Sequence, residues 1–453
     1  MNKHIIFTLI FSLWGGAFAT AQQGYSLQQC KDLVLQHSKK MKYAQLQQQK
    51  AEAVRKEAWM HHLPKVEAGF YAVQLNKKMI EFDNPSGNLP VYNGDPRTLP
   101  TATQFAFLPA VSLGAGDRMH TGNITVMQPL YAGGRIKTGN RLSELGVEVS
   151  KLQVSLSKTE LIAKTESMYW QIVALDEKQK TLDAYEKLLE TVLKEAKDAR
   201  KAGLIDKSDV LKVGLKQSEV ALNKLKLTNG RQLALMAFCQ HLGIDYSKNI
   251  RLTDALPTNN LPQHIQAEAA ASVPKRSEYQ LLQKVVKAEE MKTQIERGHF
   301  LPEVGLGASA FYSDAMEHGS DGRLARVGVF LAARIPISNM WSKRHSLKKH
   351  ILGEKMAQNK LDETKELLKL QIQKTYYALT ESAQAIALGQ KKVAQHEEFL
   401  QTIKDRHKAG VVPLSKLLEA QADVQKAKSE YIDALSHYHQ QVVAYKKATA
   451  QYE

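Results

Sequence analysis

The chain has 453 residues, of which 24% are charged, 43% are hydrophobic and only 7% are aromatic. Its formal charge at pH 7 is +16, but the lysines and arginines are spread along almost every predicted helix. This distribution argues against nucleic-acid binding and favours a basic surface or lumen. Beyond the N-terminus no apolar stretch is long enough for a spanning helix, so any membrane crossing would have to use strands.

The first 21 residues have the pattern of a secretory signal peptide. Lys3 precedes an apolar run, and small residues follow as far as Ala21, which predicts cleavage before Gln22. An uncleaved membrane anchor is the less favoured alternative, because the run is shorter than the roughly 20 residues that a spanning helix needs. We therefore expect an exported protein.

The next segment predicts a helix followed by a strand. Ser26 and Gln29 have the spacing of a capping box, which predicts a helix from Ser26 to about residue 62 that ends before Pro64. Apolar residues then alternate with polar or small ones, so we expect strands near 65–73 and 121–130. The segment between them, residues 74–120, is rich in Pro, Gly and Asn and is expected to form a long surface loop.

The second half of the chain repeats the landmarks of the first half in the same order. The equivalent pairs are Pro64 and Pro302, Pro129 and Pro336, and Gly203 and Gly410. The second and third landmarks are equally far apart in both halves, whereas the first and second are 31 residues further apart in the first half. This pattern indicates duplication of a domain-sized unit with one insertion in the first copy.

The duplication defines the expected organisation. Residues 22–243 form the first repeat, residues 244–273 a connecting segment and residues 274–453 the second repeat, with strands near 303–313 and 325–335. Each repeat has the order helix, strand, strand, long helix and helix. The expected strand boundaries are marked by four prolines: Pro64, Pro129, Pro302 and Pro336.

Two long segments predict unusually long helices. Residues 136–201 and 343–408 contain no proline and hardly any glycine, so each predicts one helix of roughly 65 residues and about 100 Å. Shorter helices are expected from about Ser208 and Ser415. Apolar residues at alternating spacings of three and four indicate coiled-coil seams. These residues are Leu182, Tyr185, Leu189, Val192, Ala196 and Ala199, and Leu417, Ala420, Val424, Ala427, Tyr431 and Ala434.

No sequence pattern predicts an enzyme, a cofactor site or a metal site. Nucleophile motifs and phosphate-binding glycine loops are missing, and the neighbouring histidines His61 and His62 do not share a helix face. Cys30 and Cys239 lie in helical patterns and are expected to be two buried small residues. A disulfide between them is the alternative, since export permits one.

Several motifs together carry a resemblance to a known family. They are Leu63-Pro64 and Leu301-Pro302 before strands, Pro129-Leu130-Tyr131-Ala132-Gly133-Gly134-Arg135 after a strand, and the stretches that follow Gly203 and Gly410. In these features the chain resembles the TolC-like outer-membrane efflux proteins over essentially its whole mature length.

The resemblance implies a homotrimer. In it, four strands from each subunit form one twelve-stranded outer-membrane β-barrel, continuous with an α-helical tunnel across the periplasm. It also implies two further partners, a periplasmic adaptor protein and an inner-membrane transporter. The predicted strands agree with this, because four strands cannot close a barrel and open edges are not tolerated in lipid.

The resemblance also implies a gate at the periplasmic tip, at Gly203, Asp209, Gly410, Lys416 and Glu419. In this family acidic residues often follow the second-half glycine by six and nine positions. Glu419 matches this pattern and Lys416 departs from it, so we expect a tip of mixed charge. The alternative is that Asp209 and Glu419 are ordinary carboxylates that stabilise the helix dipole.

The sequence thus favours an outer-membrane exit duct of a tripartite efflux or type I secretion system. The alternative is a periplasmic coiled-coil scaffold or adaptor without a pore, which has no use for four matched strands. Trp59 and Trp341 flank the strands and suit contact with outer-membrane lipid headgroups, or else mark solvated helix ends. Neither the cargo nor the transporter follows from the sequence.

Overall fold

The computed structural model describes residues 24–77, 80–91, 94–115, 118–247, 249–256, 269–315 and 323–452. The expected signal peptide and its cleavage site lie outside these residues, as do parts of the segments 74–120 and 244–273. The chain forms two compact units, one from residues 1–49, 149–284 and 359–453, the other from residues 50–148 and 285–358. Both halves of the sequence contribute to both units, so the compact units are not the sequence repeats.

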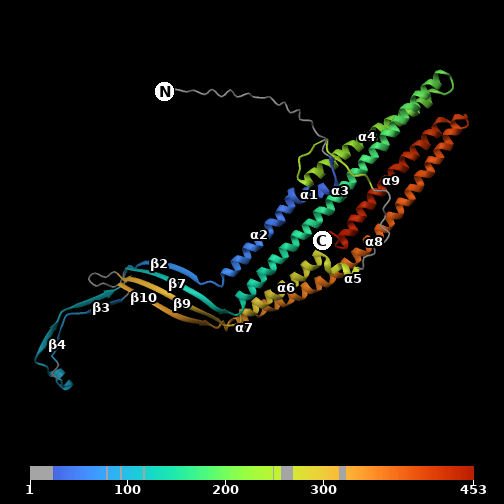
Figure 1. The fold of residues 1–453 in the computed structure, drawn as a ribbon. Helices are drawn as coiled ribbons and strands as arrows, with labels where there is room; N and C mark the ends of the chain where they lie inside the picture. The colour runs from blue at the N-terminus through green and yellow to red at the C-terminus, as the bar shows by residue number, and fades with distance from the viewer. Residues whose placement is uncertain are drawn as a thin grey trace, which may run out of the picture. The chain divides into compact units, whose positions relative to one another are not determined.

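The first unit is helical and contains the hairpins α3–α4 and α8–α9 (Figure 1). Helices α1 (Leu27–His37), α4 (Lys207–Leu242) and α9 (Leu414–Ala448) lie wholly within it. It also holds residues of α2 (Lys39–Met60), α3 (Arg135–Lys201), α6 (Ser277–Gly298) and α8 (Arg344–Lys408). Its short elements are β1 (Gly24–Tyr25), which pairs in parallel with β8 (Arg251–Leu252), α5 (Ala269–Ser272) and the 3₁₀-helix η2 (Val273–Lys275).

Most of the predicted coiled-coil residues lie in the core of this unit, whereas Ala199, Tyr431 and Ala434 are only partly buried. Leu182, Leu189 and Val192 of α3 pack in one buried cluster with Leu417 and Ala420 of α9. A larger cluster contains both cysteines as free thiols, so they do not form a disulfide. Burial raises the pKa of the Cys30 thiol to about 12, which keeps it protonated.

The first predicted helix is in fact two helices. The capping box forms as expected, because Gln29 N donates to Ser26 Oγ and Ser26 N donates to Gln29 Oε1. The helix ends at Ser38, however, whose ψ of 126° is extended. Ser38 Oγ accepts a hydrogen bond of 3.3 Å from Lys40 N, so its side chain satisfies a backbone donor at the start of α2.

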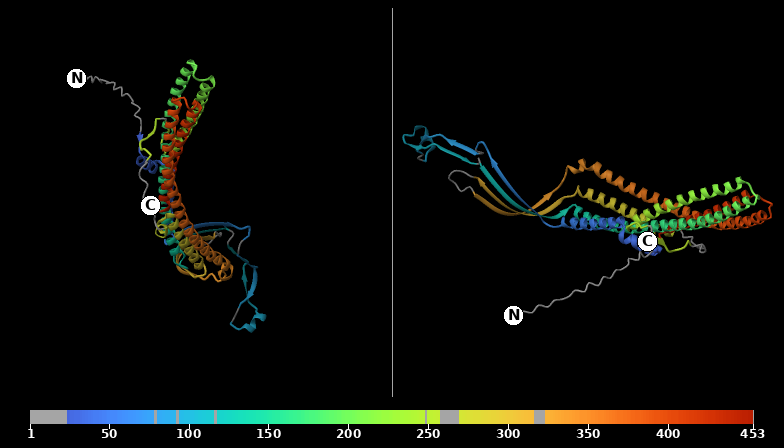
Figure 2. Two further views of the ribbon diagram at one scale, coloured as in Figure 1. Left: turned by 90° about the vertical axis from the view of Figure 1, so that its right-hand side faces the viewer. Right: turned by 90° about the horizontal axis from the view of Figure 1, so that it is seen from above.

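The second unit is built on a four-stranded antiparallel sheet of order β10-β9-β7-β2 (Figure 2). The strands are β2 (Lys65–Gln74), β7 (Arg118–Ala132), β9 (Glu303–Ala315) and β10 (Arg323–Arg334), and the short helix α7 (Asn339–Ser342) follows β10. The structure confirms the predicted order of helix, strand, strand, long helix and helix in both halves. The sheet is open, with β2 and β10 as its edge strands.

The insertion in the first half is more regular than the expected loop. It contains the strands β3 (Ile80–Asn84), β4 (Gly87–Pro90), β5 (Phe105–Leu108) and β6 (Val111–Ala115), with the 3₁₀-helix η1 (Pro96–Thr101) between β4 and β5. β3 pairs with β6 and β4 with β5, so the ladders are nested between β2 and β7. Apolar residues that alternate with polar ones, as in Glu81-Phe82-Asp83, explain the strands.

Three of the four marker prolines lie outside strands and one does not. Pro64 and Pro302 directly precede β2 and β9, and Pro336 follows the end of β10. Pro129 lies inside β7, at a register shift where Pro129 pairs with Gly305 and Tyr131 with Val304. A bulge tolerates proline because the ladder is already interrupted there, so the strand continues past it to Ala132.

The glycines that follow β7 reverse the chain toward α3. Gly133 and Gly134 have φ angles of +62° and +75°, which favour glycine. A Cβ atom on Gly133 would lie 2.1 Å from the carbonyl oxygen of Gly298. Arg135 then pairs with Glu303 at the start of β9 and donates to Ala132 O at 3.1 Å. The Gly-Gly-Arg motif therefore fixes the connection between strand and helix.

Candidate functional site

One face of the four-stranded sheet is an apolar surface. Residues that pair directly across antiparallel strands share a face, and two such rows cross all four strands. The rows are Val66, Val126, Ala308 and Val329, and Ala68, Ile124, Ala310 and Val327. Val329 and Val327 are 73% and 81% exposed in the single chain, so the face is uncovered.

The opposite face of the same strands is mixed, because the rows on either side of its central row contain Met127, Phe330 and Phe311. Its central row is Glu67, Thr125, Ser309 and Gly328. The Thr125 and Ser309 hydroxyls lie 3.1 Å apart and are hydrogen-bonded. Among the helices of the described residues, none has the length and hydrophobicity to span a membrane.

The helix hairpins end in two equivalent turns. Gly203 and Gly410 have φ angles of +78° and +73°. In the first turn, Leu204 N donates to Ala199 O and Gly203 N to Arg200 O. In the second turn, Val411 N donates to Arg406 O and Gly410 N to His407 O, which are the equivalent two bonds. Both turns are therefore Schellman motifs, which terminate α3 and α8 and allow the chain to reverse.

The second turn has one additional side-chain hydrogen bond. His407 Nδ1 lies 2.9 Å from the carbonyl oxygen of Val412. A carbonyl only accepts, so Nδ1 must carry the proton. This bond ties the end of α8 to the residues that lead into α9.

The expected tip carboxylates each pair with a lysine three residues away on the same helix. Lys212 Nζ lies 2.9 Å from Asp209 Oδ1, and Lys416 Nζ lies 2.8 Å from Glu419 Oε2. The Glu419 carboxylate raises the pKa of Lys416, with a smaller contribution from Asp423. The carboxylate is six positions after the glycine in the first half and nine positions after it in the second half. The order of negative and positive charge along the helix is therefore reversed between the two pairs.

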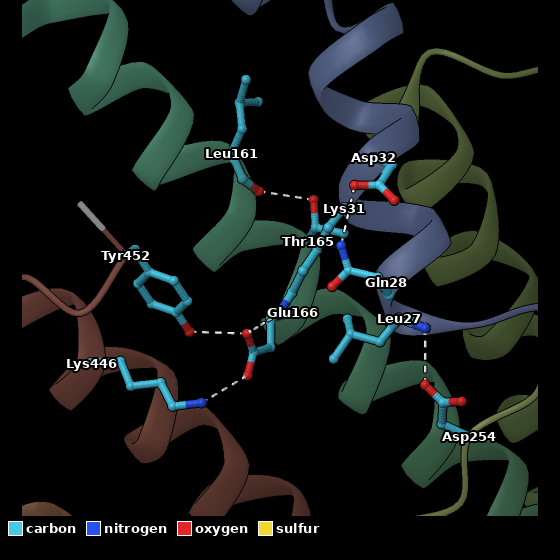
Figure 3. Close-up of polar contacts among 10 residues, drawn as sticks. All are labelled: Leu27, Gln28, Lys31, Asp32, Leu161, Thr165, Glu166, Asp254, Lys446 and Tyr452. Atoms are coloured by element: carbon cyan, nitrogen blue, oxygen red, sulfur yellow. Dashed lines mark hydrogen bonds and ion pairs between the residues drawn. The ribbon is translucent and has the colours of Figure 1, made fainter.

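A buried carboxylate ties both ends of the described chain to the first unit (Figure 3). Glu166 of α3 is 5% exposed. Its Oε2 atom accepts from Lys31 Nζ at 2.7 Å and from the Tyr452 hydroxyl at 3.0 Å, and Lys446 Nζ lies 3.8 Å from Oε1. Burial and the charge of Glu166 raise the pKa of Tyr452, so the phenol remains a donor.

Sequence reasoning missed two of these features. Lys212 could have been found by comparing the two halves nine positions after each glycine, where it replaces Glu419. Glu166 could not, because its partners are distant in sequence and nothing distinguishes it from other helical glutamates. Trp59 and Trp341, expected near lipid headgroups, are 58% and 66% exposed.

Comparisons with known proteins agree with this geometry. Residues 281–451 match the sequence profile of the family described as outer membrane efflux protein. A comparison of the sequence with curated proteins found no match.

Solved membrane proteins, among them two outer-membrane channels, share the fold of nearly the whole chain. A membrane protein from Pseudomonas aeruginosa superposes with a TM-score of 0.76 at 15% identity, covering 93% of each chain. The CmeC outer membrane channel of Campylobacter jejuni gives 0.70 at 14% identity, covering 93% of this chain and 85% of that chain. The open MtrE outer membrane channel of Neisseria gonorrhoeae gives 0.73 at 13% identity, covering 93% and 88%.

Proposed function

We propose that this chain, which resembles outer membrane efflux proteins in the sequence of residues 281–451 and in its fold, forms a passive exit duct through the outer membrane. The observation that carries the proposal is the sheet with one apolar face and two open edges. A single chain cannot satisfy the edge strands β2 and β10 in lipid.

Three copies together would satisfy the hydrogen-bonding groups of these edge strands. Edge β10 of one copy would pair with β2 of the next, which closes twelve strands into one barrel and leaves no free backbone groups at an edge. The strands have 10 to 15 residues, enough for the roughly 9–11 residues that a tilted membrane strand needs. The apolar rows would then face lipid, and the row with Thr125 and Ser309 would face the lumen.

In this proposal the helices form a periplasmic tunnel that ends at Gly203 and Gly410. A periplasmic adaptor and an inner-membrane transporter would dock there and supply the driving force, in an efflux or a type I secretion system. The chain itself contributes a pathway and no chemical step. A periplasmic scaffold without a pore is disfavoured, because it would leave the apolar rows exposed to water.

The test compares two lysine substitutions at neighbouring positions of β10. Val329→Lys places a charge on the apolar face, at a cost of about 2–4 kcal/mol near the bilayer midplane. Gly328→Lys places the same charge on the opposite face, where an added Cβ meets nothing within 4 Å. We expect outer-membrane trimers with single-channel conductance for the parent and for Gly328→Lys, and strongly reduced membrane insertion for Val329→Lys.

The readouts are membrane fractionation, native mass spectrometry and planar-bilayer conductance. A soluble parent chain without conductance would support the scaffold instead. Equal insertion of the two lysine variants would mean that the apolar rows do not face lipid.

A further inference from the structure

A basic pocket of about 920 Å³ opens in the first unit where α1 ends and α2 begins. Its walls come from the start of α2, the middle of α3 and the C-terminal ends of α4 and α9. Four lysines and two carboxylates line it, which leaves a formal excess of two positive charges. They are Lys39, Lys40, Lys164 and Lys447, and Glu160 and Asp245.

Two carboxylates in or near the pocket are already held in ion pairs. Glu160 pairs with Lys40, and the neighbouring Glu166 is held by Lys31 and Lys446. Among the described residues, the ammonium groups of Lys39, Lys164 and Lys447 make no ion pair within 4 Å, although Asp245 also lines the pocket.

One more carboxylate acts on Lys447. Glu278 lies close enough for the charge of Lys447 to help lower its pKa. Both Glu278 oxygens, however, accept hydrogen bonds from Arg276, at 3.0 and 3.3 Å. With Lys40 paired to Glu160, the pocket retains three lysines and the one carboxylate of Asp245, a formal excess of two positive charges.

The backbone around the pocket is fixed by close contacts. The break at Ser38 makes Lys39 and Lys40 the first residues of a new helix at the rim. Opposite them, Gly243 ends α4 with a φ of +76°, and a Cβ atom there would lie 2.7 Å from His37 O. The end of α4 thus lies directly against the end of α1, and only glycine permits this approach.

The hydrogen bonds of His241 define its tautomer. Thr165 Oγ1 donates its one hydrogen to Leu161 O at 2.8 Å (Figure 3), so it accepts from His241 Nε2 at 3.0 Å. Burial, with the charges of Lys164 and then Lys40, lowers the pKa of His241, which leaves the ring neutral at pH 7. Below that pKa, Nδ1 gains a proton and the pocket a further positive charge.

We propose that this pocket binds a small soluble anion of the phosphate class, held by Lys39, Lys164 and Lys447. Ammonium groups bind phosphate as point charges, whereas recognition of carboxylates favours the planar fork of arginine. No arginine is among the residues that line the pocket. Anion binding is measured without any conductance, so the inference can fail or succeed separately from the proposed function.

The test titrates inorganic pyrophosphate into the purified full-length protein by isothermal calorimetry at pH 7.5 and low salt. We expect one saturable site per chain. The variant Lys39→Gln/Lys164→Gln/Lys447→Gln should bind pyrophosphate at least about tenfold more weakly than the parent, because each lost contact is a charge-assisted hydrogen bond.

The matched control removes three exposed lysines of α8 and so the same net charge. In Lys391→Gln/Lys404→Gln/Lys408→Gln the affinity should stay within about twofold of the parent, because these screened charges lie nearer the Gly410 end of α8 than the part of α8 that packs beside Ala448. Equal weakening in both triple variants, or the lack of a saturable site in the parent, would overturn the proposal. Lys164→Gln alone, at an exposed position, provides the same comparison if the first triple variant does not fold.

A second arm uses inorganic sulfate, which keeps its two charges between pH 5.5 and 7.5. Sulfate should bind more tightly once the pH falls below the lowered pKa of His241 than at pH 7.5, because the ring then becomes positive. In His241→Gln the side-chain amide can still donate to Thr165, and the affinity should not change with pH. An equal rise in the variant would contradict the placement of His241 at the anion.

Discussion

Glu166 carries a negative charge at a position from which water is almost excluded. Three partners, Lys31, Lys446 and Tyr452, stabilise that charge. The Lys31 and Glu166 side chains are 19% and 7% exposed, so their ion pair is only weakly screened. By contrast, Lys392 and Glu430 form a similarly short ion pair with side chains 51% and 44% exposed. Exposed pairs of this kind contribute about 0–1 kcal/mol, whereas the loss of one partner of a buried pair costs more.

We expect Glu166→Gln to lower the free energy of unfolding by about 2–4 kcal/mol, because Lys31 would remain buried without a counter-charge. Glu430→Gln is the control and should change stability by less than about 0.5 kcal/mol. The apparent melting temperature of each purified variant, followed by circular dichroism, measures both changes in stability. Equal melting temperatures for the two variants would show that Glu166 does not fasten the chain ends.

Gly410 and Gly133 are required for different reasons, backbone conformation alone or conformation together with space, and alanine substitutions should distinguish them. Gly410 needs only its positive φ, since an added Cβ meets nothing within 4 Å. Gly133 needs both its φ and the space beside Gly298 O. Gly410→Ala should therefore cost about 1–2 kcal/mol of backbone strain, and Gly133→Ala distinctly more. Thermal unfolding of both variants tests the order, and a larger loss for Gly410→Ala would contradict it.

At the scale of elements, both helix hairpins end in the same turn but carry reversed charge pairs. Asp209 and Lys212 follow the first turn, and Lys416 and Glu419 follow the second. The buried residues beside them, Val213, Leu414 and Leu417, share one apolar cluster. The turns are thus joined by a common core, while the charged side chains are left to solvent.

If these residues surround the proposed entrance, Lys416→Asp should make reconstituted channels more cation-selective and more sensitive to block by multivalent cations. The substitution replaces three positive charges of a trimer by three negative ones in a narrow passage. Reversal potentials in salt gradients measure the selectivity.

The control for this prediction is Lys360→Asp. Lys360 is exposed on α8 and pairs with Glu363 at 2.8 Å, the same spacing and distance as Lys416 with Glu419. Its substitution should leave the reversal potential unchanged. An unchanged reversal potential in Lys416→Asp as well would show that Lys416 does not face the lumen.

At the scale of the whole molecule, the two halves differ most in the insertion between β2 and β7. If the strands cross the outer membrane, this insertion and the turns at Gly203 and Gly410 lie on opposite sides of it. Trypsin added to intact cells should then cut after Arg97, an exposed residue of the insertion, and leave Arg200 and Lys408 intact.

Mass spectrometry of the fragments measures this topology. Cells with a permeabilised outer membrane serve as the control, in which cleavage at the helix turns becomes possible. Protection of Arg97 together with cleavage after Lys408 in intact cells would invert the proposed orientation.

The sequence by itself determined the succession of elements in each half, the coiled-coil seams and the two reversing turns. These features depend on contacts between residues close in the chain, or on glycine and proline at single positions. The alternation of Val66 to Ala72 likewise predicted a strand with two different faces.

Only the tertiary structure decided which residues meet across the chain. The break at Ser38 depends on a hydroxyl that caps the next helix, and the strands inside the insertion depend on pairing between segments whose sequence suggested a loop. Pro129 lies within β7 because a bulge accommodates it. The ion pairs of Glu166 join α1, α3 and α9, and their partners are separated by more than a hundred residues. The lysine pocket likewise joins α2, α3, α4 and α9, which local patterns cannot reveal.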